Sequence, residues 1–129
     1  MPRAKWFEGA RLNMIEQAFR YHEDEPERPA IISRSEIRPR QELPWGDMKK
    51  RVASFAHGLR RMGVEPGDRV VACLPNIPET LVAFYACASI GAIWSSCSPD
   101  MGTRSVTDRF RQIDHQGDDR GGGRLPLRG

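Results

Sequence analysis

Hydrophobic residues are unevenly distributed along this chain and are concentrated between residues 52 and 94. Two short apolar runs, residues 70–74 and 92–95, flank a segment of helical length that starts at Pro78. This alternation is typical of a β-α-β unit with parallel strands. The run at 70–74 does not alternate apolar with polar residues, which predicts a strand covered on both faces. The chain is therefore expected to be organised around residues 68–100.

The segment between the two strands, residues 78–90, is apolar around most of its circumference, so its helix is expected to be buried on more than one side. Pro78 suits the first turn of that helix, and Gly91 is expected to end it. A last helix is expected over residues 103–113, with Val106, Phe110 and Ile113 on one face.

Upstream of this unit, apolar residues step by four, three, four and three positions, which predicts one amphipathic helix. These residues are Met48, Val52, Phe55, Leu59 and Met62. Asp47 is the expected N-cap. Gly63 is placed for the left-handed position after the helix, with Val64 as the accompanying apolar contact.

Nearer the start, Asn13 is expected to cap a short helix over residues 14–21, with Glu16 as its capping-box partner. Residues 30–33 and 42–45 predict a pair of short strands. Residues 22–29 are acidic and contain prolines, which predicts a loop. His22 beside three acidic residues is interpreted as part of a solvated loop, because nothing in the sequence fixes a metal geometry there.

Composition narrows the function classes. The 129 residues carry 20 basic and 17 acidic side chains, a net charge of +3, with both signs interspersed. Such mixing argues against a nucleic-acid partner. No apolar run reaches about 18 residues, so no membrane association is expected. A mean hydropathy of −0.58 is polar for a self-contained parallel α/β fold.

Cys73, Cys87 and Cys97 match neither a zinc spacing nor a CxxC redox motif. Their odd number and the absence of a secretory signal favour a reducing, cytoplasmic location. Cys73 and Cys87 lie in apolar runs and are expected to be buried thiols. Cys97 as a nucleophile lacks a nearby basic partner in sequence. The hydroxyl residues at 95–98 either line a pocket at the carboxyl end of the strand or cap the next helix, and capping is the favoured interpretation.

Four segments of the chain carry a family resemblance: WFEGARLN at residues 6–13, LPWGDM at 43–48, GVEPGDRVVACLPNIPE at 63–79 and ASIGAIWSSCSPDMGTRSVTDRFRQID at 88–114. Together they resemble the acetoacetate-CoA ligase branch of the adenylate-forming acyl-CoA synthetases. The last segment is the most specific. The acetyl- and propionyl-CoA synthetases share the lead-in and the PGDRV turn but differ after the GAI strand.

The resemblance implies an α/β chain that is an incomplete N-terminal portion of the adenylate-forming fold, with a parallel β-α-β unit preceded by an irregular lead-in and a helix. It implies a lead-in region over residues 1–46, the start of the AMP-dependent ligase domain over 47–114, and an altered tail over 115–129. The sequence alternatives are a fragment of an acetyl- or propionyl-CoA synthetase and a small basic binding or interaction module without catalysis.

The family activity implied is ATP-dependent ligation of acetoacetate to coenzyme A through an acyl-adenylate, with ATP, coenzyme A and Mg²⁺ as cofactors of the intact enzyme. The Ser/Thr/Gly-rich phosphate loop ending in Pro-Lys does not occur in this sequence. No catalytic, cofactor-binding or metal-binding residue is therefore carried over, and no cofactor is expected to bind this chain. Association with an intact synthetase is a further expectation.

After residue 114 the chain departs from the family pattern. The family continues with an apolar strand similar to K-V-M-I-A-V and then a G-Y-R-Y-G segment, whereas this chain reads HQGDDRGGGRLPLRG. Codons for Gln116–Gly121 exist that encode K-V-M-I-A-V when read one base later, and codons for residues 124–128 encode G-Y-R-Y-G in the same shift. We therefore expect an extra base near the codon of His115, leading to an early stop and a polar, flexible tail.

Overall fold

The protein is described from a computed structural model that covers residues 7–115. The expected altered tail falls almost wholly on residues 116–129, which lie outside the described residues. In chain order the elements are α1 (Met14–Arg20), β1 (Pro29–Ser33), β2 (Gln41–Pro44), α2 (Trp45–Arg61), β3 (Arg69–Cys73), α3 (Pro78–Ser89), β4 (Ile93–Cys97), the 3₁₀ turn η1 (Pro99–Met101) and α4 (Thr103–His115).

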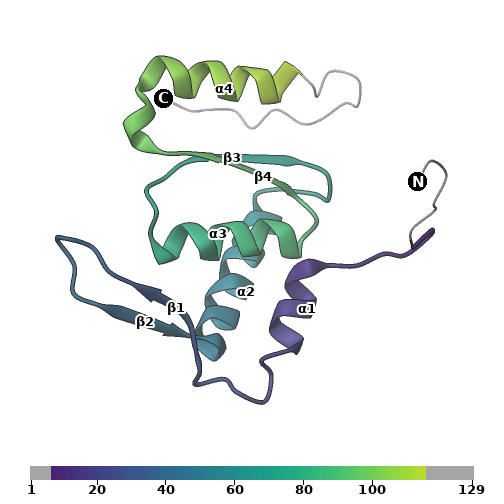
Figure 1. Ribbon diagram of the computed structural model, residues 1–129. Coiled ribbons are helices and arrows are strands. Elements are labelled where there is room, and N and C mark those ends of the chain that lie inside the picture. The colour runs from purple at the N-terminus through teal and green to yellow at the C-terminus, as the bar shows by residue number, and fades with distance from the viewer. Residues whose placement is uncertain (1–6, 116–129) are drawn as a thin grey trace, which may run out of the picture.

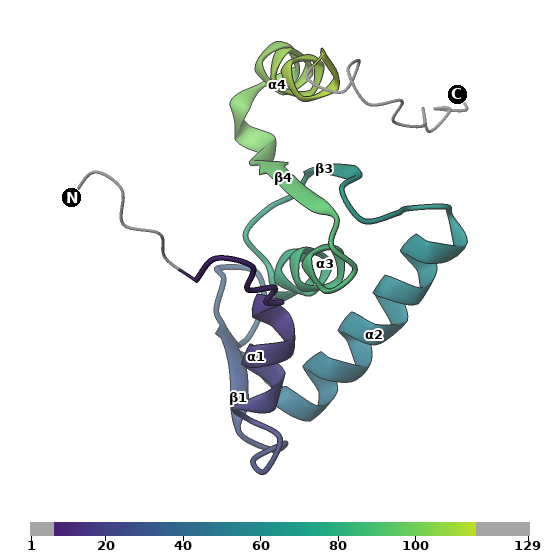
Figure 2. The ribbon, with the colours of Figure 1, turned by 90° about the vertical axis from the view of Figure 1, so that its right-hand side faces the viewer.

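Strands β3 and β4 form the expected parallel pair, in register from Arg69 opposite Ile93 to Cys73 opposite Cys97. Helix α3 connects them and packs on one face of the pair, while α4 lies over the opposite face (Figure 1). Viewed from the side, α1 and α2 lie beyond α3, so the order of layers is α4, β3–β4, α3 and then α1 with α2 (Figure 2). The β-α-β unit predicted from the sequence is confirmed.

Strands β1 and β2 pair antiparallel, with Ile31 opposite Leu43 and a register shift between Pro29 and Ile31. This hairpin lies beside the start of α2 (Figure 1). Its two strands were expected, and because the sheet has two strands among the described residues, each strand is also an edge.

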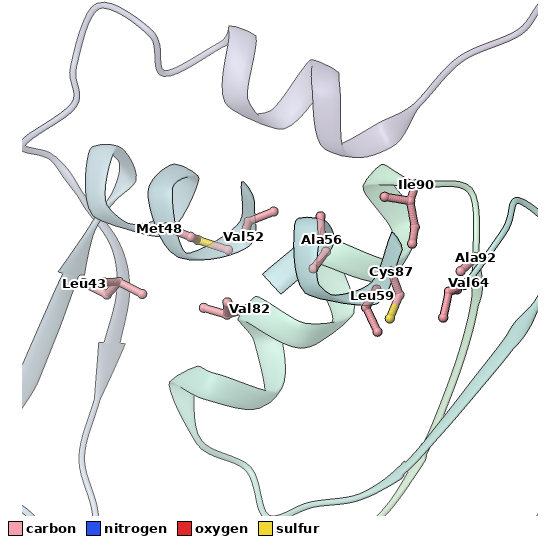
Figure 3. Close-up of a cluster of buried hydrophobic side chains, with 11 residues drawn as sticks. Leu43, Met48, Val52, Ala56, Leu59, Val64, Val82, Cys87, Ile90 and Ala92 are labelled. Atoms are coloured by element: carbon pink, nitrogen blue, oxygen red, sulfur yellow. The ribbon is translucent and has the colours of Figure 1, made fainter. Parts of the chain in front are cut away.

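The core lies between α2 and α3, not on the sheet (Figure 3). Its buried members come from β2, α2, α3 and the connections that follow α2 and α3, and they are Leu43, Met48, Val52, Ala56, Leu59, Val64, Val82, Ala86, Cys87, Ile90 and Ala92. Ala86 and Cys87 on α3 are fully buried. Small residues at the centre of α3 allow α2 to approach closely, which explains why α3 is buried on more than one side, as its composition predicts.

Asn13 links the lead-in to α3. Its Oδ1 accepts a hydrogen bond from the Ile15 backbone N–H at 2.9 Å, which confirms the expected N-cap. Its Nδ2 also donates to the carbonyl oxygens of Ala88 at 3.1 Å and Ser89 at 3.2 Å. One amide side chain therefore satisfies a free donor at the start of α1 and two carbonyls in the last turn of α3.

The C-terminal end of α2 follows the sequence prediction. Gly63 has φ of 87°, and the Val64 backbone N–H donates to the Leu59 carbonyl oxygen at 3.1 Å. The Gly63 N–H donates to Arg60, and the Val64 side chain is buried. This is a Schellman ending, for which glycine is favoured because of its positive φ.

The N-terminal end of α2 differs from the prediction. The helix begins at Trp45 with Pro44 at the cap position, and Asp47 lies inside the first turn, where its carboxylate pairs with Lys50 at 3.2 Å. Proline has no backbone N–H, and the start of a helix does not need one, because the first N–H groups have no partner within the helix. An acidic residue in the first turn still interacts favourably with the helix dipole. The N-cap prediction for Asp47 is therefore wrong.

Two further burial predictions are wrong. Ala56 takes the buried place expected for Phe55, and Phe55 and Met62 are 45% and 62% exposed. The buried residues of α2 step by four, four and three positions, so the buried stripe is centred to one side of the predicted one and leaves Phe55 and Met62 at its edge. On β3, Val71 is 39% exposed because α4 covers that face only in part.

Candidate functional site

A hollow of about 210 Å³ lies between the carboxyl end of β4 and helix α4, and we call it the α4 hollow. Its lining residues are Ser95, Ser96, Cys97, Arg109, Phe110, Gln112 and Ile113. Ligands of open α/β sheets bind beyond the carboxyl ends of strands, so the position is the one where a site is expected.

Alternation along the strands defines which residues face α4. The Arg69 Nη1 donates to the carbonyl oxygen of Ile113 at 2.8 Å, so Arg69 lies on the α4 side of β3. Val70 and Trp94 instead pack against the core. Because successive side chains point to opposite faces of a strand, Val71 and Cys73 lie on the same face of the sheet as Arg69. Cys97 lies on this face too, because it is the register partner of Cys73.

The expected apolar face of α4 is confirmed in its position and only partly in its burial. Val106, Phe110 and Ile113 are half-buried toward the sheet, while Asp108 and Arg111 are exposed and form a loose ion pair. Ile113 and Phe110 line the α4 hollow together with Arg109, which lies at the edge of that face.

Cys97 is buried at the floor of the hollow, with an exposed fraction of 7%. Burial raises the pKa of its thiol, and a hydrogen bond and charge interaction with Cys73 raise this pKa further, while Arg109 lowers it. Arg109 is thus a basic neighbour that only the tertiary structure shows, but because the pKa of Cys97 stays raised, the interpretation that no basic partner activates Cys97 as a nucleophile holds.

The prediction that Cys73 is a buried thiol is wrong, because Cys73 is exposed. Cys87 is buried as expected. Cys73 ends β3 on the incompletely covered face, and an apolar sequence run does not show which of its faces will lack a partner. Burial raises the pKa of the Cys87 thiol.

The hydroxyl residues at the carboxyl end of β4 line the pocket instead of capping a helix. Ser95 and Ser96 lie in the wall of the α4 hollow, and the Trp94 Nε1–H donates to Ser96 Oγ at 3.2 Å. Ser98 precedes η1 but its side chain makes no capping hydrogen bond. Helix α4 starts later, after Gly102 with φ of 74°, which separates the serines from its free N–H groups.

Residues 22–28 form the expected exposed loop, but the ring of His22 is packed and not solvated. Its ring stacks on Trp45 with centroids 4.2 Å apart and an interplanar angle of 16°, and its Nδ1 is buried without a hydrogen-bond partner. Phe19 meets the same Trp45 edge-on at 5.9 Å. This aromatic contact fixes the loop after α1 to the start of α2.

Within residues 7–115, no group of three or more His, Cys, Asp or Glu side chains is placed to hold a metal ion. In the same range, no helix is long and apolar enough to cross a lipid bilayer. The α4 hollow combines hydroxyls, one thiol and one guanidinium, which suits polar contact and thiol chemistry. It brings no carboxylate or imidazole to Cys97 as a general base.

A second hollow, of about 420 Å³, lies on the outer surface of α2 and is more apolar. It is lined by Arg51, Ser54, Phe55, Gly58, Leu59 and Met62. The exposed Phe55 and Met62, which the sequence predicted to be core residues, form its walls.

Comparison with known proteins defines the class. The sequence profile described as "AMP-binding enzyme" matches residues 18–116, which include the hairpin, α2, the β-α-β unit and α4. The chain belongs to the AMP-binding enzyme family, and the family resemblance predicted from its sequence segments is confirmed.

The particular relatives are acetoacetyl-CoA synthetases. The chain is 46% identical over 110 residues to the acetoacetyl-CoA synthetase of Rattus norvegicus and 44% identical over 110 residues to that of Rhizobium meliloti (strain 1021). These alignments cover 84% and 85% of this chain but 16% of each relative. The chain thus matches one limited segment of a much longer protein.

Solved structures agree. The acetoacetyl-CoA synthetase from Streptomyces lividans superposes with a TM-score of 0.81 at 47% identity, over 88% of this chain and 18% of that one. A fatty acid AMP ligase from Legionella pneumophila gives a TM-score of 0.69 at 17% identity, which shows a shared fold alone. The α/β fold class, as part of an acyl-CoA synthetase fold, is confirmed.

Proposed function

We propose that this chain is the N-terminal segment of an acetoacetate-CoA ligase. The activity of the whole enzyme is formation of acetoacetyl-adenylate from acetoacetate and ATP, followed by displacement of AMP by coenzyme A. The observation that carries the proposal is identity of 44–47% to named acetoacetyl-CoA synthetases over 84–88% of this chain.

In this proposal the segment acts as scaffold. Its β-α-β unit begins a parallel sheet, and the carboxyl ends of β3 and β4 border the region where such sheets bind ligands. The α4 hollow has no general base and no phosphate-binding loop. We therefore assign no catalytic residue to residues 7–115 and expect ATP, Mg²⁺ and coenzyme A to be held by parts of the enzyme outside this segment.

A segment exchange tests the assignment. Residues 7–115 replace the corresponding segment of the Streptomyces lividans acetoacetyl-CoA synthetase, and acetoacetyl-CoA formation is measured with acetoacetate, acetate and propionate. The expected hybrid keeps activity within about tenfold and keeps the preference for acetoacetate, because a scaffold segment does not contact the reacting atoms. The 129-residue chain alone is expected to form no acyl-adenylate.

A matched control separates misfolding from misassignment. The same segment is placed in an acetyl-CoA synthetase, where less similar contacts should reduce folding and activity far more. An acetyl-CoA synthetase hybrid that works better than the acetoacetyl-CoA synthetase hybrid would favour the alternative of an acetyl- or propionyl-CoA synthetase fragment. ATP-dependent thioester formation by the isolated chain would refute the scaffold proposal.

A second candidate function is association with an intact synthetase. The β3–β4 sheet has two strands among the described residues, so both of its edges are open to further pairing. Its α4-facing side also exposes Val71 and Ile93. Co-expression of the tagged chain with full-length acetoacetyl-CoA synthetase, followed by affinity purification, is expected to retain the synthetase, and a chain that elutes alone would contradict it.

A further inference from the structure

Two cysteines far apart in sequence meet at the carboxyl end of the parallel sheet. Cys73 ends β3, Cys97 ends β4, and the two are direct register partners. Registered residues in neighbouring strands point to the same face, and adjacent strands lie about 4.8 Å apart. That spacing falls within the Cα separations of about 4.4–6.8 Å that a disulfide spans.

The contacts of Cys97 direct its thiol toward β3. Its Sγ lies 3.7 Å from the carbonyl oxygen of Ala72, the residue before Cys73. The side chain of Cys73 is also close enough to contribute to the raised pKa of the Cys97 thiol. Both cysteines are free in this structure.

The two thiols differ in access. Cys73 is exposed, whereas Cys97 is 7% exposed at the floor of the α4 hollow, beside Arg109. An oxidant in solution therefore reaches Cys73 first, and Cys97 is placed to react with the product. An exposed cysteine next to a resolving cysteine is the usual arrangement of reversible thiol oxidation.

We propose that Cys73 and Cys97 form a redox-sensitive pair that a hydroperoxide converts into a disulfide joining β3 to β4. This modification site is independent of the proposed ligase function. Disulfides in reducing compartments are usually transient or regulatory, and a pair of this kind is suited to that use.

The chemistry balances with hydrogen peroxide as oxidant. The Cys73 thiolate attacks one peroxide oxygen, the O–O bond breaks, and the departing hydroxide takes up the proton that Cys73 released to form water. Cys97, on losing its proton, attacks the sulfur of the resulting sulfenic acid. The S–S bond forms, the S–O bond breaks, and the departing hydroxide becomes a second water. Two thiols and one peroxide thus give one disulfide and two waters.

The test is peptide mapping of the folded 129-residue chain after treatment with hydrogen peroxide and alkylation under denaturing conditions. Trypsin leaves all three cysteines in one peptide, because no Lys or Arg lies between residues 70 and 103. Chymotrypsin separates them by cutting after Tyr85 and Trp94. The expected product is a linked peptide pair containing Cys73 and Cys97, lighter by two hydrogen atoms and released by a dithiol reductant, with Cys87 fully alkylated.

Variants make the test specific. Cys87→Ala retains the pair and is expected to form the same bridge, whereas Cys73→Ser and Cys97→Ser are expected to form none. Oxidation of the chain in denaturant provides a second comparison, because random pairing there should link Cys87 to either partner. Native oxidation that joins Cys87 to another cysteine, or that takes Cys73 to sulfinic acid while Cys97 stays alkylatable, would overturn the proposal.

Discussion

Asn13 shows how one polar side chain fixes two helices that are distant in sequence. Its Oδ1 caps α1, and its Nδ2 donates to two carbonyls at the end of α3. Asn13→Ala removes the cap and leaves these carbonyls without that donor, so we expect a loss of about 1–2 kcal/mol in the free energy of unfolding. Urea denaturation followed by circular dichroism measures it.

Asn13→Asp is the matched control for this residue. An aspartate keeps the cap acceptor but brings a carboxylate to the Ala88 and Ser89 carbonyl oxygens, where the amide donated. We expect this variant to be destabilised as well, since its charge faces the negative end of the α3 dipole. Full stability in Asn13→Asp would show that the cap alone matters and that the α1–α3 link contributes nothing.

Cys87 makes stability depend on alkaline pH. Burial raises its pKa above the ordinary 9.0 of a thiol, so at alkaline pH the unfolded chain binds fewer protons than the folded chain. The stabilising contribution is complete below pH 9.0 and is lost as the pH rises through the raised pKa. Thermal unfolding across this range is expected to show a falling midpoint, with a shallower fall in Cys87→Ala. Equal slopes in both proteins would contradict this.

At the scale of elements, α2 has one face of buried residues that stabilise the fold and another face of apolar residues that remain exposed. Leu59 is 5% exposed in the core, and Phe55 is 45% exposed on the same helix. Leu59→Ala is expected to cost about 2–5 kcal/mol because it opens a cavity against α3. Phe55→Ala should cost about 1 kcal/mol or less. Parallel urea denaturation of the two variants measures the difference, and similar losses would refute this division of α2.

The elements themselves were predictable because each is specified by local pattern. The parallel pair, the apolar α3 and the glycine ending of α2 all follow from apolar runs and from Gly63. What the sequence did not show is which face of an element lacks a neighbour. Phe55 and Val71 are apolar and exposed for that reason, since periodicity records where a side chain points but not whether anything covers it.

The position of the candidate site was predictable from the sequence, but the set of side chains that meet there was not. The hydroxyl-rich segment at residues 95–98 indicated a pocket or a cap, and Ser95 and Ser96 line a pocket in the structure. The proximity of Cys97 to Cys73 and Arg109 follows from the register of two strands and the position of α4. The strand register and the position of α4 are tertiary features that no local pattern encodes. Neighbouring parallel strands do, however, place their last residues close to each other.

For the whole molecule, the region of family similarity has a sharp boundary. The AMP-binding profile matches up to residue 116, next to His115, where the apolar continuation of the family is replaced by a Gly- and Arg-rich sequence. We propose that the frame changes at this point. Sequencing the gene is expected to show a K-V-M-I-A-V-like strand in a neighbouring frame directly after the codon of His115. A gene without such a strand in any frame would disprove the frame change.

The exposed side of the sheet determines how the isolated chain should behave in solution. Val71 and Ile93 are 39% and 53% exposed on the face that α4 covers in part, beside two open strand edges. Contiguous apolar surface next to unpaired edges promotes association, so the chain is expected to form concentration-dependent oligomers. Light scattering after size exclusion measures this.

Val71→Thr combined with Ile93→Thr should shift the chain toward monomer, because threonine keeps strand propensity while removing apolar area. Ile37→Thr is the matched control, since Ile37 is 91% exposed but lies in the hairpin loop, away from the sheet. We expect the control to associate as the unchanged chain does. If the double variant and the control associate equally, the sheet face is not the site of contact, and the hollow on α2, with Phe55 and Met62, becomes the surface to substitute next.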